Sequence, residues 1–166
     1  MASSLKAKEG TLRYLRSKVV AVVATICLDA TPEAATVFYW INDVDEAGFC
    51  FYFLSRRNTR KFQNLLANPA VAIVVGTEFE PETVQMSGVA EIIDAGNSLD
   101  GLEELKKRLV KHPVQAALYA GAFFPKNPFA AIEGKEFSLY RVRPSWVRHM
   151  TVDKKTKHIE YVQILP

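Results

Sequence analysis

The segment 49–55, with the sequence FCFYFLS, limits the possible folds of this chain more than any other part. Side chains of a β-strand point alternately to the two faces of its sheet. This segment is apolar at both odd and even positions, which is typical of a strand buried on both faces. We therefore expect the fold to cover both faces of this strand.

Several other segments have the apolar, β-branched composition of strands. The turn sequences DATPEA and NDVDEAG separate the first three, and such short connections favour antiparallel pairing. With about seven strands and few helices, the sequence predicts a mainly β fold with flanking helices (α+β), in which the sheet curls into a small β-barrel. The predicted strands are 19–28, 35–41, 49–55, 70–75, 83–93, 137–142 with a continuation after Pro144, and 157–164.

Helical periodicity is expected over residues 3–17, after residue 58 up to the ANP stop at 67–69, over 99–111 and over 114–122. The 166 residues contain no repeat or linker, so we expect one domain over 1–166. A net charge of +3 is too small to indicate a nucleic-acid partner. The sequence has no signal-peptide pattern and no apolar run of roughly 20 residues, which predicts a cytoplasmic protein without a membrane partner.

The predicted helix after residue 58 begins with cations at the end where the helix dipole favours anions. Arg56, Arg57, Arg60 and Lys61 gather there, and the stretch 53–75 contains no acid. A bound anion would accept hydrogen bonds from the first N–H groups and neutralise the cations. Asn58 or Thr59 can cap the helix. The pattern is typical of a phosphate cradle, and the alternative is a solvated basic face whose arginines pair with carboxylates elsewhere.

The order of these features resembles the pyridoxamine 5'-phosphate oxidase-like superfamily of FMN-binding split β-barrels. FYFLS, TRK, NLLANPAVAIVV and VQMSGVAEI follow one another as in that family, and the resemblance covers roughly residues 15 to 94, with a weaker echo in FSLYRVRPSWVRHM. It implies a homodimer with FMN bound between subunits. It also implies that the phosphate is held by Thr59, Arg60 and Lys61, and that the flavin lies along Phe53, Leu54, Ser55, Thr36 and Val37.

Two further residues are candidates for the flavin ring. Gln85 can hydrogen-bond a ring edge from the strand 83–93, and Trp146 can stack near the ring. The alternatives are an outward polar side chain and a core or interface tryptophan. For the phosphate, true pyridoxamine phosphate oxidases also use an arginine on the second strand, and the equivalent position here, near Thr36, lacks one. Arg148 can face the flavin, a substrate anion or a surface carboxylate.

The sequence therefore predicts an FMN-dependent oxidoreductase that acts on a small-molecule substrate of unknown identity, with no catalytic residue identified. The first alternative is a non-catalytic protein of the same fold that binds or senses a flavin or haem. The second is a small barrel that binds nucleic acid through its basic cluster, which is disfavoured because FCFYF looks buried. The three histidines and the two cysteines, Cys27 and Cys50, show no metal-ligand spacing, so no metal is expected.

Overall fold

A computed structural model describes residues 2–44, 48–76, 81–93, 136–153, 155–156 and 158–165 of the chain. Within these residues, two helices and seven strands follow one another. They are α1 (Ala2–Ser17), β1 (Val20–Ile26), β2 (Pro32–Val44), β3 (Gly48–Arg56), α2 (Arg60–Ala67), β4 (Ala70–Val75), β5 (Glu82–Ile93), β6 (Phe137–Val152) and β7 (Ile159–Leu165).

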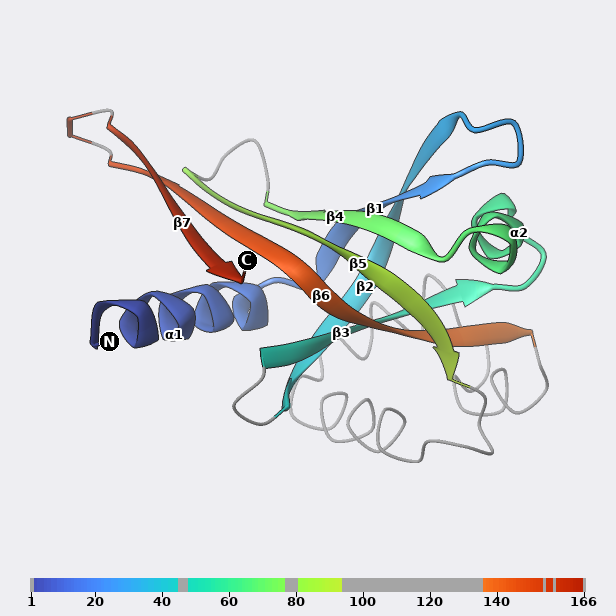
Figure 1. The fold of residues 1–166 in the computed structure, drawn as a ribbon, viewed down its shortest axis with the longest axis horizontal. Helices are drawn as coiled ribbons and strands as arrows, with labels where there is room; N and C mark the ends of the chain where they lie inside the picture. Colours follow the sequence, from blue (N-terminus) through green and yellow to red (C-terminus); the bar gives the residue numbers. More distant parts are fainter. Residues whose placement is uncertain are drawn as a thin grey trace.

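The strands of the described part form one antiparallel sheet in the order β3-β2-β1-β4-β5-β6-β7. An additional antiparallel pairing between β3 and β6 joins the first strand of this order to the sixth. The sheet is therefore a closed barrel of six strands, with β7 extending beyond it along β6 (Figure 1). This confirms the predicted small β-barrel.

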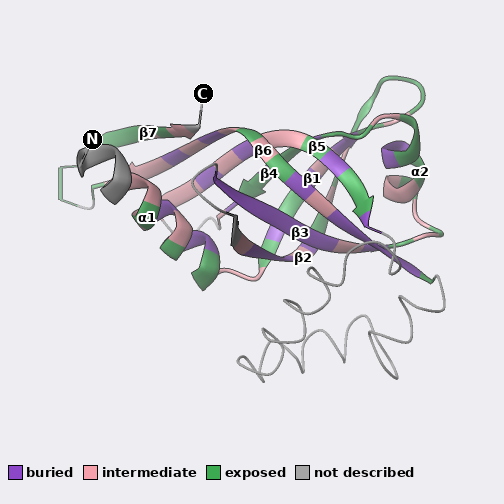
Figure 2. Cartoon of the chain, turned by 60° about the horizontal axis from the view of Figure 1, so that its bottom comes forward, coloured by how far each residue is buried: buried purple, intermediate pink, exposed green. Residues whose placement is uncertain are grey.

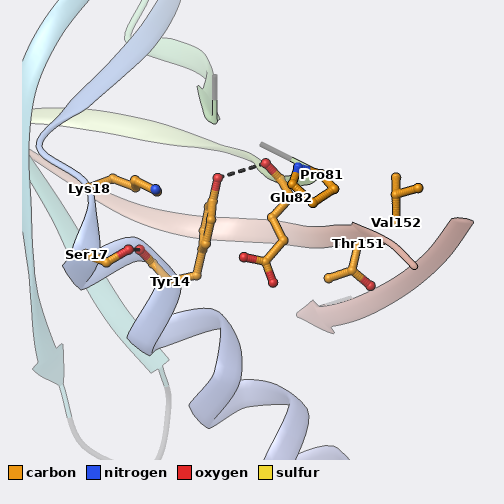
Figure 3. A pocket seen from close by; sticks show the side chains of 7 residues that line it. All are labelled: Tyr14, Ser17, Lys18, Pro81, Glu82, Thr151 and Val152. Carbon is orange, nitrogen blue, oxygen red and sulfur yellow. Dashed lines mark hydrogen bonds between the residues drawn. The ribbon is translucent and has the colours of Figure 1, made fainter. Parts of the chain in front are cut away.

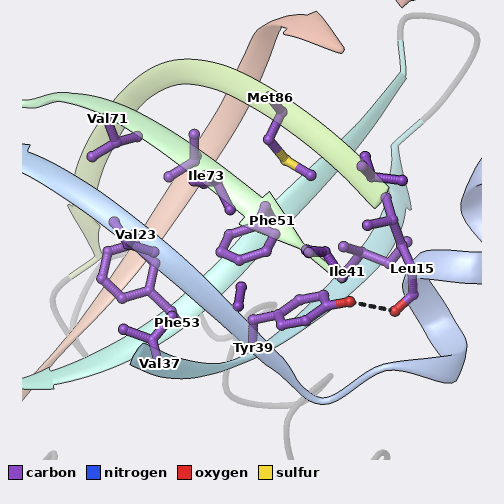
Figure 4. Packing of buried hydrophobic residues seen from close by; sticks show 14 of the residues in the cluster. Leu15, Val23, Val37, Tyr39, Ile41, Phe51, Phe53, Val71, Ile73 and Met86 are labelled. Atoms are coloured by element: carbon purple, nitrogen blue, oxygen red, sulfur yellow. Dashed lines mark hydrogen bonds between the residues drawn. The ribbon is translucent and has the colours of Figure 1, made fainter. Parts of the chain in front are cut away.

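The barrel interior is filled by inward-pointing apolar side chains from every strand of the ring. Tyr39 stacks on Phe51 with ring centroids 4.6 Å apart, and Phe53 stacks on Tyr140 at 4.9 Å. These stacked rings lie among β-branched residues such as Val23 and Ile73, all buried (Figure 4). Aromatic pairs in this geometry add about 0.5–1.5 kcal/mol beyond the burial of their area.

Strand β3 also packs on its other face. Cys50 and Tyr52 belong to a second buried cluster with Trp40, Ile93 and Leu139, in which the rings of Trp40 and Tyr52 stack at 5.5 Å. Both faces of β3 are therefore covered, as its composition predicts, and the strand is buried over most of its length (Figure 2).

Helix α1 lies at one end of the barrel and α2 at the other (Figure 1). The Tyr39 hydroxyl donates to the Leu15 carbonyl at 2.7 Å, so a core residue satisfies one of the last carbonyls of α1. Thr11 Oγ1 lies 3.0 Å from His149 Nδ1, and burial lowers the pKa of this histidine. Neither described helix is both long and apolar enough to cross a membrane.

The strand boundaries differ from the prediction at two prolines. Strand β2 begins at Pro32, inside the predicted turn. Proline lacks an N–H but is tolerated as the first residue of a strand. Strand β6 runs unbroken through Pro144, which lies opposite Gly88 at an irregularity in the pairing with β5. The predicted helices 99–111 and 114–122 lie outside the described residues.

The irregularity beside Gly88 gives a testable prediction. Ser87 pairs with Trp146 and Gly88 with Pro144, so Ser145 is the extra residue of a β-bulge. A Cβ added at Gly88 would lie 2.6 Å from the Arg143 carbonyl oxygen. We expect Gly88→Ala to lower the free energy of unfolding by about 1–3 kcal/mol in denaturant titrations.

The matched control is Gly10→Ala. A Cβ at this position in α1 meets nothing within 4 Å. Alanine is the better helix former by about 1 kcal/mol, so this variant should be neutral or more stable. Equal stability of the two variants would contradict the proposed packing at the bulge.

Candidate functional site

The start of α2 is built by the end of β3 and the turn that follows it. Thr59 is the N-cap, and its hydroxyl accepts from the Phe62 N–H at 3.3 Å and donates to the Arg56 carbonyl at 2.8 Å. The buried Ser55 places its hydroxyl 3.1 Å from that of Thr59. The cap predicted for Asn58 or Thr59 is thus made by Thr59.

The four cations of this segment occupy different positions. Arg60 and Lys61 are the first two residues of α2, and its first turn contains no acid. Arg56 ends β3, with its guanidinium 5.3 Å from the Phe137 ring centroid, whereas Arg57 lies in the turn over Phe62 at 5.9 Å. Pairing of Arg56 with Phe137 across β3 and β6 prolongs the strand, so of the four cations Arg60 and Lys61 are the two that belong to the first turn of the helix.

A carboxylate from the β1–β2 hairpin reaches this helix start. Glu33 Oε2 lies 3.5 Å from Arg60 Nε, and the buried Asn64 donates to the same oxygen at 2.9 Å. Asn64 also donates to Thr25 Oγ1 at 3.0 Å. Arg60 Nη2 lies 3.6 Å from Cys27 Sγ. The half-buried Cys27 is thus a free thiol within a polar cluster rather than a core residue.

The Lys61 side chain is less accessible than that of Arg60. Its side chain is half-buried, and this burial lowers the pKa of its ammonium, while the charge of Glu33 raises it in part. The Arg60 side chain is 75% exposed. An anion at the start of α2 would therefore offset the burial of one cation and meet a second that is already exposed.

Three predicted ring-binding residues lie on the outer face of the barrel. Across neighbouring strands the register aligns Thr36, Val22, Val74, Gln85 and Arg148 in one row. The adjacent row contains Ala34, Ala24, Ala72, Ser87 and Trp146. We call these two rows the outer face; their side chains are exposed or half-buried, while the residues between them in sequence are mostly buried. The second row consists of small residues up to Trp146, which leaves space above the sheet for a flat group.

Arg148 occupies the end of the first row. Its Nη2 donates to Gln85 Oε1 at 2.6 Å, and its guanidinium lies 5.3 Å from the Trp146 ring centroid and 5.1 Å from that of Tyr161. Arg148 Nε is buried and has no hydrogen-bond partner in the described part of the chain. A half-buried guanidinium at the edge of the outer face suits an acceptor atom supplied by a ligand or by another chain.

The remaining predicted residues point elsewhere. The side chains of Val37 and Phe53 belong to the barrel core, so any contact of these two positions with a cofactor would be through main-chain atoms. Leu54 packs half-buried on the second cluster. The candidate site therefore has two parts, the start of α2 and the outer face. Strand β2 contributes to both, with Glu33 at the start of α2 and Thr36 on the outer face.

A pocket of about 430 Å³ lies at the opposite end of the barrel (Figure 3). Tyr14, Ser17 and Lys18 line it from α1 and the residue after it, together with Pro81, Glu82, Thr151 and Val152. Two of its hydroxyls already interact within the protein, since Tyr14 donates to the Glu82 carbonyl at 2.8 Å and Ser17 to the Tyr14 carbonyl at 2.7 Å. No predicted site residue lines this pocket.

The sequence did not point to Glu33 or Asn64. They are 31 residues apart, and nothing in the local pattern indicates that the β1–β2 hairpin meets α2. For Arg148 the sequence left open whether it faces the flavin, a substrate anion or a surface carboxylate. Its alternation with Trp146 on one strand was the available signal, because residues i and i+2 share a face.

A sequence profile of the pyridoxamine 5'-phosphate oxidase family matches residues 8–151. No curated protein matches the sequence. Many solved structures share the fold, and the following three are all below 20% identity.

An FMN-binding protein of Nostoc punctiforme, related to pyridoxamine 5'-phosphate oxidase, has a TM-score of 0.52 and 17% identity over 99% of this chain and 94% of its own. A FAD-binding protein of Mesorhizobium loti has a TM-score of 0.56 and 18% identity, covering 82% and 88%. A heme-binding protein of Mycobacterium smegmatis has a TM-score of 0.58 and 18% identity, covering 92% of this chain and 56% of its own. These likenesses show the split-barrel fold.

The hydrogen bonds of Asn64 give a testable prediction. Asn64→Ala would leave the Glu33 carboxylate and the buried Thr25 hydroxyl without this donor. We expect the free energy of unfolding to fall by about 1–3 kcal/mol in urea. Gln63→Ala, an exposed position of the same helix, is the control and should change it by less than about 0.5 kcal/mol. Similar losses in both variants would contradict a structural role specific to Asn64.

Proposed function

Because the chain belongs to the pyridoxamine 5'-phosphate oxidase family, we propose that it binds FMN in a homodimer and uses the flavin to oxidise or reduce a small molecule. The observation that carries this proposal is the start of α2. Two cations follow the threonine cap at the start of this helix, and the first turn has no acid. Such an arrangement favours an anion, and the phosphate of FMN is the anion that the family resemblance implies.

The residues at the start of α2 fit a phosphate. First-turn N–H groups and the Arg60 and Lys61 side chains would supply charge-assisted hydrogen bonds. The Thr59 hydroxyl is already used twice in the cap, so Thr59 would contribute mainly by holding the helix start in place. The half-buried ammonium of Lys61 would gain most from a ligand, because burial disfavours its charge in the free protein.

The outer face fits the ring of the flavin. The small side chains of Ala24, Ala34, Ala72 and Ser87 leave the sheet flat beside Trp146. Gln85 and Arg148 offer polar atoms at the edge of this surface. In this arrangement the protein orients the ring and limits its contact with water.

When bound, FMN supplies hydride or electron transfer. The first row of the outer face contains threonine, valine, glutamine and arginine side chains and no carboxylate, histidine or cysteine. This composition suits a site that positions a redox cofactor and its substrate better than one that performs hydrolysis. The substrate would be a small molecule admitted between the outer face and the partner subunit.

Exposed apolar side chains support the homodimer. Val22 and Val74 are paired on the outer face and are about 40% exposed, and so is Val20, which shares a face of β1 with Val22. Contiguous apolar surface of this kind is typical of an interaction site. A second copy of the chain would cover these valines and enclose a ring lying on the same face.

A non-catalytic protein that stores or senses a flavin or haem is the second candidate. The observation that favours it is the outer face of β2, where Ala34 and Thr36 provide no second-strand cation for the phosphate. Reduction of the bound cofactor by added nicotinamide reductants, followed by transfer to an acceptor with multiple turnover, would distinguish an enzyme from such a binder.

Loss of the two cations should weaken binding of FMN much more than binding of riboflavin, which lacks the phosphate. We expect Arg60→Ala and Lys61→Ala each to raise the Kd for FMN by about tenfold or more, because each removes a charged donor. Quenching of flavin fluorescence during titration measures both ligands.

The charge-matched control for this pair is Arg13→Ala, an exposed position on α1 at the other end of the barrel. It should leave both affinities within about twofold. Equal weakening of FMN and riboflavin by Arg60→Ala and Lys61→Ala would contradict a phosphate contact at the start of α2.

A charge on the outer face should break the proposed dimer. Val74→Glu would bury an unpaired carboxylate twice in a two-fold interface. We therefore expect the dissociation constant of the dimer to rise by at least about a hundredfold. Sedimentation velocity across a concentration series measures this. Leu28→Glu, at a residue that is 84% exposed in the β1–β2 turn, is the control. A dimer that tolerates Val74→Glu would place the interface elsewhere.

A further inference from the structure

Glu33 is held in a fixed position beside the proposed phosphate site. Asn64, which is only 5% exposed, donates to Glu33 Oε2 at 2.9 Å and is itself anchored to Thr25. The Glu33 side chain is 30% exposed. The carboxylate is thus tied to α2 through a buried amide and cannot move away from the helix start without breaking that bond.

The fixed carboxylate occupies donors that a phosphate would use. Glu33 Oε2 lies 3.5 Å from Arg60 Nε, and Cys27 Sγ takes a second edge of the guanidinium at 3.6 Å. The charges of Glu33 and Asp29 both act on Arg60, and that of Glu33 also acts on Lys61. One negative charge therefore stands in the site before any ligand arrives, and an incoming phosphate meets its repulsion.

We propose that Glu33 is an internal counter-anion of the phosphate site, which competes with the flavin phosphate for Arg60 and so sets how strongly the site prefers FMN over an uncharged flavin. This inference rests on the proposed function. Glu33 is a specificity-determining residue in this account, because it changes the binding of the phosphate and leaves the binding of the ring unaffected.

The test is a double-mutant cycle read out with two ligands. Glu33→Gln removes the charge and retains an oxygen that can accept from Asn64, so the fold should be preserved. We expect it to lower the Kd for FMN by about two- to fivefold, the range of a partly exposed charge pair, with no change for riboflavin. In the Arg60→Ala background the same substitution should have a smaller effect on FMN, because the competing pair is gone.

The control for this cycle is Glu91→Gln. Glu91 pairs with Arg141 at 2.6 Å on β5 and β6, so the substitution removes the same charge from another ion pair. It should leave the affinities for FMN and riboflavin unchanged. Thermal unfolding of every variant confirms that differences in affinity arise in folded protein.

Three results would overturn the inference. An unchanged or weaker affinity for FMN in Glu33→Gln would show that Glu33 is neutral or positions Arg60 for the ligand. An equal gain for FMN and riboflavin would show an effect on the ring site. Failure of every variant and of the natural sequence to bind either flavin would overturn the proposed function as well. Binding of riboflavin distinguishes the first two results from this one, because riboflavin still binds in those two.

Discussion

The pairing of β3 with β6 is the contact on which the rest of the structure depends. It joins the two strands that close the six-stranded ring, and the stacked rings of Phe53 and Tyr140 lie directly on it. The pairing continues to Arg56 opposite Phe137, so β3 ends at the rim of the barrel. Thr59 then caps α2 at that rim, and Arg60 and Lys61 are the first residues of the helix. Closure of the barrel therefore determines where the cations of the candidate site lie.

The alternation of side chains in the closed barrel separates its core from its binding surface. Val23, Val37 and Ile73 fill the interior, while their neighbours Val22, Thr36 and Val74 form a row on the outside. A shift of one residue in register would exchange these sets, so the core and the outer face depend on the same pairing. The outer face remains partly apolar, and it is the surface over which we propose that a second copy of the chain encloses the cofactor.

Local sequence patterns predicted those features that depend on neighbouring residues. The doubly apolar composition of β3 predicted its burial, and the turn sequences between successive strands predicted an antiparallel barrel. The residues Asn58 and Thr59 before Arg60 predicted a cap for α2, and the structure gives this role to Thr59. Contacts between distant segments were not predictable in this way. Glu33 meets Asn64 only because the β1–β2 hairpin folds onto α2, and Arg56 belongs to β3 rather than to α2 because of its pairing with Phe137. Single-sequence periodicity carries no information on either contact.

The central claim is that the start of α2 holds the phosphate of FMN while the outer face holds the ring. A crystal structure of the chain grown with saturating FMN tests this most directly. The account predicts phosphate oxygens within hydrogen-bond distance of Lys61 Nζ and of first-turn N–H groups of α2, with the ring beside Gln85 and Trp146 and a second copy over the exposed valines. FMN bound in the pocket at Tyr14 and Glu82, or its absence from the start of α2 at saturation, would contradict the account.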